Sequence, residues 1–178
     1  MKIGICGPGM AGKDTVATEL ASILGLRYFA GTSKWAAQLV FERIGRFYRS
    51  VEDCWNDRRN HREEWARIIG EYNSKDPVAL YRDCLKDQDF LTGIRWKHEF
   101  RACAAAGLVD LWIYVSREGC KDSTCQITPQ DCDLTIVNDG TLGDLNWKLG
   151  TIGSILRSHL DKENRSASLV TPCHLITE

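Results

Sequence analysis

Residues 7–15 read Gly-Pro-Gly-Met-Ala-Gly-Lys-Asp-Thr, and this stretch decides the fold. It follows a short apolar run, Ile3 to Cys6, and precedes a segment whose apolar residues recur at helical spacing. Gly7, Gly12 and Lys13 match the spacing G-x-x-x-x-G-K of a phosphate-binding loop. Glycines allow several backbone N–H groups to point at one phosphate chain, and the lysine adds a positive charge. The order strand, loop, helix therefore predicts a nucleotide-phosphate site.

The loop departs from the usual pattern at one position. Asp14 follows Lys13, where many such loops carry a Ser or Thr that binds Mg²⁺, and the hydroxyl comes one place later at Thr15. We expect Asp14 and Thr15 to supply the protein ligands of a magnesium ion.

Composition sets broad limits on the function. The chain has 178 residues and a formal net charge of −1, so it has no overall attraction to nucleic acid or to an anionic membrane. No apolar run is long enough to span a bilayer, and the N-terminal residues lack the layout of a signal peptide. Eight cysteines are spread singly along the chain. A reducing, cytoplasmic location is the simplest expectation, which means the host cytoplasm if the chain is encoded by a phage.

Apolar runs and turn signals predict an α/β fold with a five-stranded parallel sheet. The expected strands cover residues 2–6, 26–29, 88–94, 111–115 and 134–137, and helices are expected between them. Thr141 is expected to cap a last helix, and residues 161–178 are expected to form a loose polar tail.

A helical region of about residues 32–86 is expected to bind the phosphate acceptor. Within it, residues 57–72 read as one charged helix, on which Arg58 and Arg62 share a face. These arginines either form an anion-binding wall or pair with acids of their own helix. Arg95 follows an expected strand at the sheet edge where ligands bind, and it contacts a phosphate or simply caps the strand.

Residues 116–130 are polar and include Arg117 and Lys121. Their place in the chain is typical of a lid that closes over transferring phosphates, although an ordinary surface loop explains the composition equally well.

Three motifs together resemble the tailed-phage nucleotide kinases of the adenylate kinase-like P-loop group. They are Gly-Lys-Asp-Thr at 12–15, Thr-Gly-Ile-Arg at 92–95 with Glu99, and Asn-Asp-Gly-Thr at 138–141. The resemblance covers residues 1 to 157 and implies a three-layer P-loop kinase domain over residues 1–160 that uses ATP and Mg²⁺. Gly93 departs from the pattern, because an acid that reaches Mg²⁺ through water is expected there.

The resemblance also assigns roles to residues. Arg58, Arg62, Arg95 and Glu99 would face the acceptor, and the catalytic group would comprise Lys13, Asp14, Arg95 and Arg117. The nucleotide would be held by Gly7, Gly9, Ala11, Gly12, Lys13, Asp14 and Thr15, with Asn138, Gly140 and Thr141 near the adenine.

Members of this group act on two kinds of acceptor. Short members phosphorylate 5-hydroxymethyluracil in phage DNA, on the route to hypermodified thymines, and others are deoxynucleoside monophosphate kinases. The length of the chain and the interleaving of Trp55 and Trp65 with arginines favour the base in DNA, whereas the balanced charge opposes it. A hydroxymethyl acceptor would benefit from a base, for which Asp14, Asp57 and Glu99 are candidates.

A P-loop protein that binds nucleotide without catalysis remains an alternative, and dephospho-coenzyme A kinase-like chemistry is a weaker one. The oligomeric state is left open.

Overall fold

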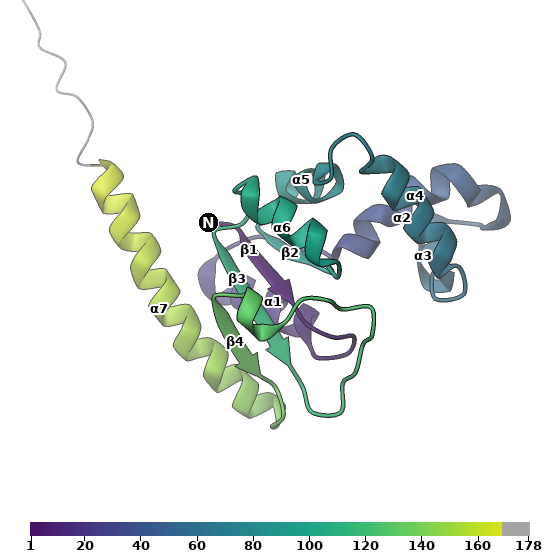
Figure 1. The fold of residues 1–178 in the computed structure, drawn as a ribbon. Coiled ribbons are helices and arrows are strands. Elements are labelled where there is room, and N and C mark those ends of the chain that lie inside the picture. The colour runs from purple at the N-terminus through teal and green to yellow at the C-terminus, as the bar shows by residue number, and fades with distance from the viewer. Residues whose placement is uncertain (169–178) are drawn as a thin grey trace, which may run out of the picture.

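Four parallel strands form the sheet at the centre of the protein. The computed structural model describes residues 1–168, with side chains described as far as residue 162. The strands are β1 (Ile3–Cys6), β2 (Phe90–Thr92), β3 (Leu111–Ser116) and β4 (Leu134–Val137), and they lie in the order β2-β1-β3-β4 (Figure 1). Ile3 pairs with Phe90 on one side of β1 and with Leu111 on the other.

Helices cover both faces of this sheet. Because successive strand residues point to opposite faces, Ile3 and Ile5 pack with α1 (Lys13–Leu24) and α7 (Leu142–Ser168). Cys6 and Trp112 pack instead with α5 (Ala79–Asp87) and α6 (Lys97–Ala105). The structure thus confirms an α/β fold with a parallel sheet flanked by helices.

The predicted strand at residues 26–29 is wrong, and the sheet has four strands rather than five. This segment runs beside β2 without joining the ladder, because side chains supply most of its hydrogen bonds to the β2 side. Gln88, which is fully buried, accepts hydrogen bonds from the N–H groups of Phe29 and Ala30 at 3.1 and 3.3 Å. Asp89 accepts one from the N–H of Arg27 at 2.9 Å, and its own N–H donates to the carbonyl of Arg27 at 2.7 Å.

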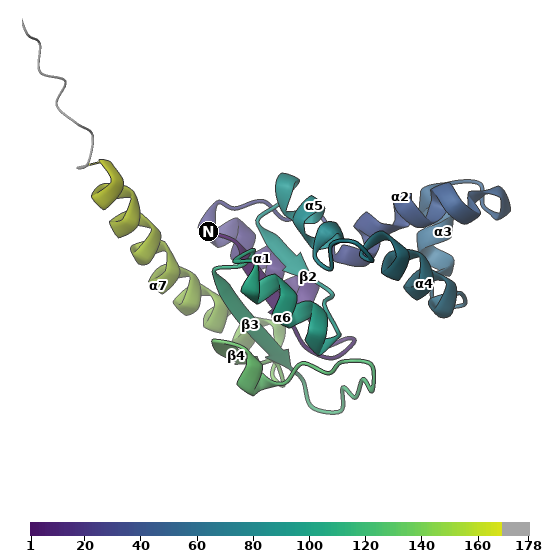
Figure 2. The same ribbon diagram turned by 45° about the horizontal axis from the view of Figure 1, so that its top comes forward.

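Helices from residues 32–72 project from the sheet as an arm (Figures 1 and 2). The arm comprises α2 (Thr32–Ile44), a 3₁₀ turn η1 (Gly45–Phe47), α3 (Val51–Asp57) and α4 (Arg62–Tyr72). A single helix over 57–72 was the wrong prediction, because a turn at 58–61 separates α3 from α4. Ser50 caps α3 by accepting a hydrogen bond from Asp53 N at 3.1 Å, which starts this helix earlier than the sequence suggested.

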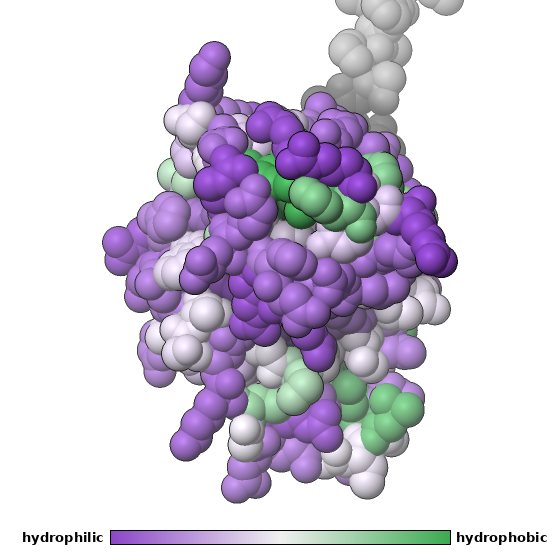
Figure 3. Space-filling model, turned by 90° about the vertical axis from the view of Figure 1, so that its right-hand side faces the viewer, coloured by the Kyte–Doolittle hydropathy of each residue, from purple (hydrophilic) through white to green (hydrophobic). Residues whose placement is uncertain are grey.

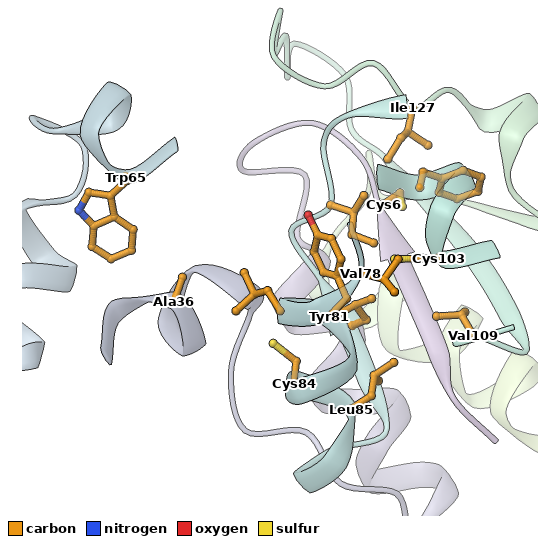
Figure 4. Packing of buried hydrophobic residues seen from close by; sticks show 14 of the residues in the cluster. Cys6, Ala36, Trp65, Val78, Tyr81, Cys84, Leu85, Cys103, Val109 and Ile127 are labelled. Atoms are coloured by element: carbon orange, nitrogen blue, oxygen red, sulfur yellow. The ribbon is translucent and has the colours of Figure 1, made fainter. Parts of the chain in front are cut away.

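A continuous apolar cluster attaches the arm to the body of the protein. In Figure 4, Trp65 and Ala36 lie on the side of the arm, and Tyr81, Cys103 and Val109 lie beside the sheet. All five are buried. Trp65 is therefore a core residue and is not free to stack on a ligand.

The last helix begins as predicted and ends later than predicted. Thr141 Oγ1 accepts a hydrogen bond from Asp144 N at 3.2 Å, while Asp144 Oδ2 accepts from Thr141 N at 2.8 Å, so the two residues cap α7 reciprocally. The helix continues to Ser168, so the expectation of a loose tail is wrong for residues 161–168. The rest of that predicted tail, residues 169–178, lies outside the described part. Among residues 1–168, no helix has both the length and the apolar content needed to cross a membrane.

Candidate functional site

The predicted motifs meet at one edge of the sheet. Since all four strands are parallel, their carboxyl ends lie on the same side. At this edge each strand is followed by a connecting segment. These segments are residues 7–12 after β1, 93–96 after β2, 117–128 after β3 and 138–141 after β4. Segments that are distant in sequence are thus neighbours.

The backbone of the loop requires its glycines. Gly7 has φ +135°, and a Cβ there would lie 2.2 Å from the carbonyl oxygen of Val115. Gly12 has φ +96°. Met10, with φ +63°, is the only non-glycine residue of positive φ in the described part of the chain, and its side chain is 81% exposed. The left-handed conformation of a long side chain represents local strain, which is common at ligand-binding loops.

Lys13 lies folded against this loop. Its Nζ donates to the carbonyl oxygens of Gly7 and Pro8 at 2.9 and 2.6 Å. Burial and the nearby charge of Arg95 lower the pKa of Lys13. The structure therefore places the positive charges of Lys13 and Arg95 near each other at the loop.

Asp14 belongs to a small group of oxygen atoms next to the loop. Its Oδ1 accepts hydrogen bonds from the hydroxyl of Tyr28 at 2.6 Å and from Thr92 Oγ1 at 3.2 Å. Burial, and then the bond to Asp14, raise the pKa of the Tyr28 hydroxyl, so it remains a donor. A Cβ at Gly31 would lie 2.8 Å from Thr92 Oγ1, so the backbone of Gly31 closes the group on one side.

These oxygen atoms suit a hard cation. Mg²⁺ usually takes one or two carboxylates together with substrate phosphates, and Asp14 and Thr92 offer such donors. Thr15 is exposed and its hydroxyl makes no hydrogen bond within the described residues, so the structure does not bring Thr15 into this group. The described residues contain no cluster of three His, Cys, Asp or Glu side chains that could hold a metal alone.

Arg95 and Asp122 connect the neighbouring segments. Arg95 Nη1 donates to Asp122 Oδ2 at 2.5 Å and to Thr124 Oγ1 at 2.7 Å. The same Asp122 oxygen accepts the N–H of Gly9 at 2.9 Å. Burial raises the pKa of Asp122, but the Thr124 hydroxyl, the Gly9 N–H and Arg95 outweigh it and lower the pKa to about 2.

The 117–128 segment is tied down at its far end. Gln126 N donates to the carbonyl of Arg95 at 2.8 Å, and Ile127 is buried in the core. Arg117 lies at the other end, exposed, and its side chain has no partner among the described residues. The structure therefore does not place Arg117 at the loop, and its catalytic role stays a prediction.

Asn138 holds the loop from the other side. Its Nδ2 donates to Ala11 O at 2.9 Å, and a Cβ at Gly12 would lie 2.5 Å from that nitrogen. Thr141 caps α7, and a Cβ at Gly140 would crowd Asp144. The expected contact of Asn138, Gly140 and Thr141 with adenine stays a prediction.

The predicted acceptor residues lie in three places: Arg95 at the loop, Arg58 and Arg62 on the arm, and Glu99 on α6 beside α5. Arg58 stacks on the ring of Trp55, with its guanidinium carbon 4.1 Å from the ring centre, and its Nη1 donates to Trp55 O at 2.9 Å. Its pKa is lowered by burial first, and further by Arg59, Arg62 and Arg95, against the opposing charge of Asp14. Arg58 and Arg62 belong to a turn and to the start of α4, so the predicted shared helix face is wrong.

Glu99 lies elsewhere, between α5 and α6. Burial raises the pKa of its carboxyl, and a hydrogen bond with the hydroxyl of Tyr81 partly offsets this. No contact in the described structure joins Glu99 to the loop.

Sequence reasoning missed three contributors to the site: Tyr28, Gly31 and Asp122. Asp122 lies 113 residues from Gly9, so no local pattern could join them. The sequence Asp-Ser-Thr at 122–124 does fit a carboxylate that caps its own turn, and Asp122 Oδ1 accepts from Thr124 N at 3.1 Å and from Thr124 Oγ1 at 2.6 Å.

No protein-family model matches the chain, and no curated protein matches it significantly.

Proposed function

We propose that this chain is an ATP-dependent phosphotransferase of the adenylate kinase-like P-loop group, acting on the hydroxymethyl group of 5-hydroxymethyluracil in phage DNA. One observation carries the proposal: the glycine loop with Lys13, Arg95 from the end of β2, and the Asp14 carboxylate lie together at one edge of a parallel sheet. This combination offers backbone donors and two cations to phosphates and an oxygen ligand to a metal.

The chemistry would be in-line transfer of the γ-phosphoryl group. Such a reaction needs mainly positioning and the neutralisation of charge on the phosphoryl oxygens. Lys13 and Arg95 carry positive charge at the loop, and Asp14, oriented by Tyr28 and Thr92, would hold Mg²⁺. When bound, Mg²⁺ would add charge neutralisation across the phosphates.

Arginines on the arm support a polynucleotide acceptor. Four exposed arginines at the end of the arm have no carboxylate partner within the described residues, and they are Arg46, Arg49, Arg59 and Arg62. The face of the molecule shown in Figure 3 is mostly hydrophilic, with small apolar patches. A surface groove of about 410 Å³ is lined by residues 59–64, and an adjoining one of about 470 Å³ includes Phe47, which is 70% exposed. Arginine and an exposed aromatic ring suit backbone phosphates and an unstacked base.

Two of the candidate bases, Glu99 and Asp57, have pKa shifts in opposite directions. Burial raises the pKa of Glu99, and no contact in the described structure joins Glu99 to the loop. Hydrogen bonds from Asn60 and Tyr48 lower the pKa of Asp57.

A deoxynucleoside monophosphate is the second candidate acceptor. It is favoured by Arg58, because the charges of Arg95 and Asp14 act on its pKa, and a guanidinium within that range of the loop could hold a small phosphate.

One experiment separates these acceptors. The protein is incubated with γ-labelled ATP and, in parallel, with deoxynucleoside monophosphates, DNA containing 5-hydroxymethyluracil, and unmodified DNA. Label in the modified DNA alone supports the proposal, and label in free diphosphates alone contradicts it. Intact ATP binding without transfer to any acceptor would leave a non-catalytic P-loop protein.

Two lysine variants test whether the loop binds the phosphates of ATP. Lys13→Ala should abolish transfer, whereas Lys86→Ala should not change it, because Lys86 pairs with Asp83 on α5 at 2.6 Å, away from the loop. Full activity of Lys13→Ala would refute the assignment of the loop.

Arginine variants test whether the arm binds the DNA backbone. The double change Arg59→Ala and Arg62→Ala should raise KM for the modified DNA and reduce the salt slope of binding by about 2, because two phosphate contacts are lost. Arg67→Ala should do neither, since Arg67 is held by Glu64 at 2.7 Å on the same helix. An unchanged salt slope in the double variant would contradict a polynucleotide site on the arm.

A further inference from the structure

The carboxylate of Asp122 makes the contacts that a phosphate oxygen would make. Its Oδ2 accepts the N–H of Gly9 in the glycine loop at 2.9 Å and the Nη1 of Arg95 at 2.5 Å. A backbone N–H of a phosphate loop and a guanidinium are the donors that bind phosphate oxygens elsewhere in this class of site. The side chain of Asp122 is 13% exposed, so the contact is largely shielded from solvent.

These donors cannot serve two anions at once. The Gly9 N–H has one hydrogen, and it points at Asp122 Oδ2. A Cβ at Gly9 would lie 3.3 Å from that same oxygen, so the carboxylate lies directly against the loop backbone. A phosphate that takes these donors must displace the carboxylate, and two negative charges at this distance would repel each other.

We propose that Asp122 is a built-in competitor of phosphate, whose carboxylate holds the Gly9 N–H and Arg95 until a polyphosphate displaces it. This inference rests on the proposed function, because it concerns the regulation of the same loop. Displacement transfers Arg95 from Asp122 to the incoming phosphates. It also frees the middle of the 117–128 segment while Ile127 stays anchored in the core. Nucleotide binding and release of this segment are thereby coupled.

The charge of Asp122 supports competition rather than proton transfer. Thr124, Gly9 and Arg95 together overcome the effect of burial and keep the pKa near 2, so the carboxylate is ionised throughout the physiological range. A group with that pKa is an inefficient proton acceptor at neutral pH. Its oxygen is also separate from the Asp14 group, where Tyr28 and Thr92 orient the other carboxylate.

The test compares the binding of inorganic tripolyphosphate by the wild-type protein and by Asp122→Asn, with calorimetry in the presence and absence of Mg²⁺. The amide is close in shape to the carboxylate but carries no charge, so the variant should bind about tenfold more tightly in both conditions. Without ligand, the same variant should unfold at a lower denaturant concentration, because the ion pair with Arg95 is lost. A purely structural role of Asp122 would lower the stability without making tripolyphosphate bind more tightly.

Asp131→Asn is the matched control. Asp131 is in the same connection between β3 and β4 and also has a pKa of about 2, caused first by Lys97 and then by Thr128. Its partner Lys97 Nζ is 2.8 Å away, and it makes no contact with the loop. This variant should therefore bind tripolyphosphate as the wild type does.

The outcomes separate the inference from the proposed function. Equal or weaker binding by folded Asp122→Asn, with binding by the wild type intact, would overturn the inference alone. Binding weakened only in the presence of Mg²⁺ would overturn it in favour of a metal-ligand role. No binding of tripolyphosphate by the wild type or by either variant would refute the phosphate loop, and with it the proposed function.

Discussion

Asp89 should control the acid stability of the protein. Its carboxylate accepts from Lys2 Nζ at 2.8 Å and from Arg27 N at 2.9 Å, and it is 14% exposed. Burial raises the pKa of Asp89, but these donors outweigh it and lower the pKa from 3.8 to about 2. At about 1.4 kcal/mol per pKa unit, the ionised carboxylate contributes about 2 kcal/mol to the free energy of unfolding.

The sign follows from the depressed pKa. The contribution is fully present above pH 3.8, the value for the unfolded chain, and is lost as the pH falls through about 2. Asp89→Asn should therefore be about 2 kcal/mol less stable than the wild type at pH 7. The difference should shrink between pH 4 and pH 2, where the wild-type carboxyl becomes protonated.

Urea unfolding at pH 7, 4, 3 and 2 measures this difference. With an m-value of about 2 kcal/mol per molar, the midpoint of Asp89→Asn should fall by about 1 M at pH 7. Asp87→Asn is the control, because Asp87 is exposed and has no partner among the described residues. Equal midpoints for the two variants at pH 7, or a difference that persists at pH 2, would refute the reasoning.

Three further changes probe the loop and its neighbours. Met10→Gly should be about 1 kcal/mol more stable than Met10→Ala in urea unfolding, because only glycine relieves the strain of φ +63°; equal stability would show that no strain is stored there. Tyr28→Phe removes the donor 2.6 Å from Asp14 and should weaken the apparent Mg²⁺ affinity of phosphoryl transfer several-fold with KM for ATP nearly unchanged, as a Mg²⁺ titration of the rate would show. An unaltered titration would contradict the role of Tyr28 in orienting Asp14. Gly31→Ala should cost about 1–3 kcal/mol in urea unfolding, because its Cβ would lie 2.8 Å from the buried hydroxyl of Thr92, and a neutral effect would mean that the segment yields freely.

Local signals allowed the first part of the fold to be predicted. The strand before Gly7, the loop and the helix after it follow one another directly, so each boundary is marked by neighbouring residues. The cap at Thr141 was also recognisable, because Asp144 follows three residues later. Parallel pairing then placed the carboxyl end of each strand at one edge.

The errors lie where distant side chains decide the structure. Residues 26–29 have the composition of a strand, but Gln88 and Asp89 satisfy their backbone groups from about 60 residues away. The prediction of one helix over 57–72 is wrong because a turn at 58–61 separates α4 from α3, which Ser50 caps. Nothing near Asp122 in sequence indicates that its carboxylate reaches Gly9. Such contacts depend on the completed fold and cannot be read from periodicity.

Two departures from the common pattern, one in the loop and one after β2, are related. A hydroxyl usually follows the loop lysine, and here that position holds the carboxylate of Asp14. The neighbouring strand, on which an acid is expected, ends with the hydroxyl of Thr92, 3.2 Å from Asp14 Oδ1. Gly93 follows with φ +101°, a conformation in which an acidic side chain would be strained. On the proposed function, the acid and the hydroxyl have exchanged places between β2 and the loop, so one metal site explains both departures.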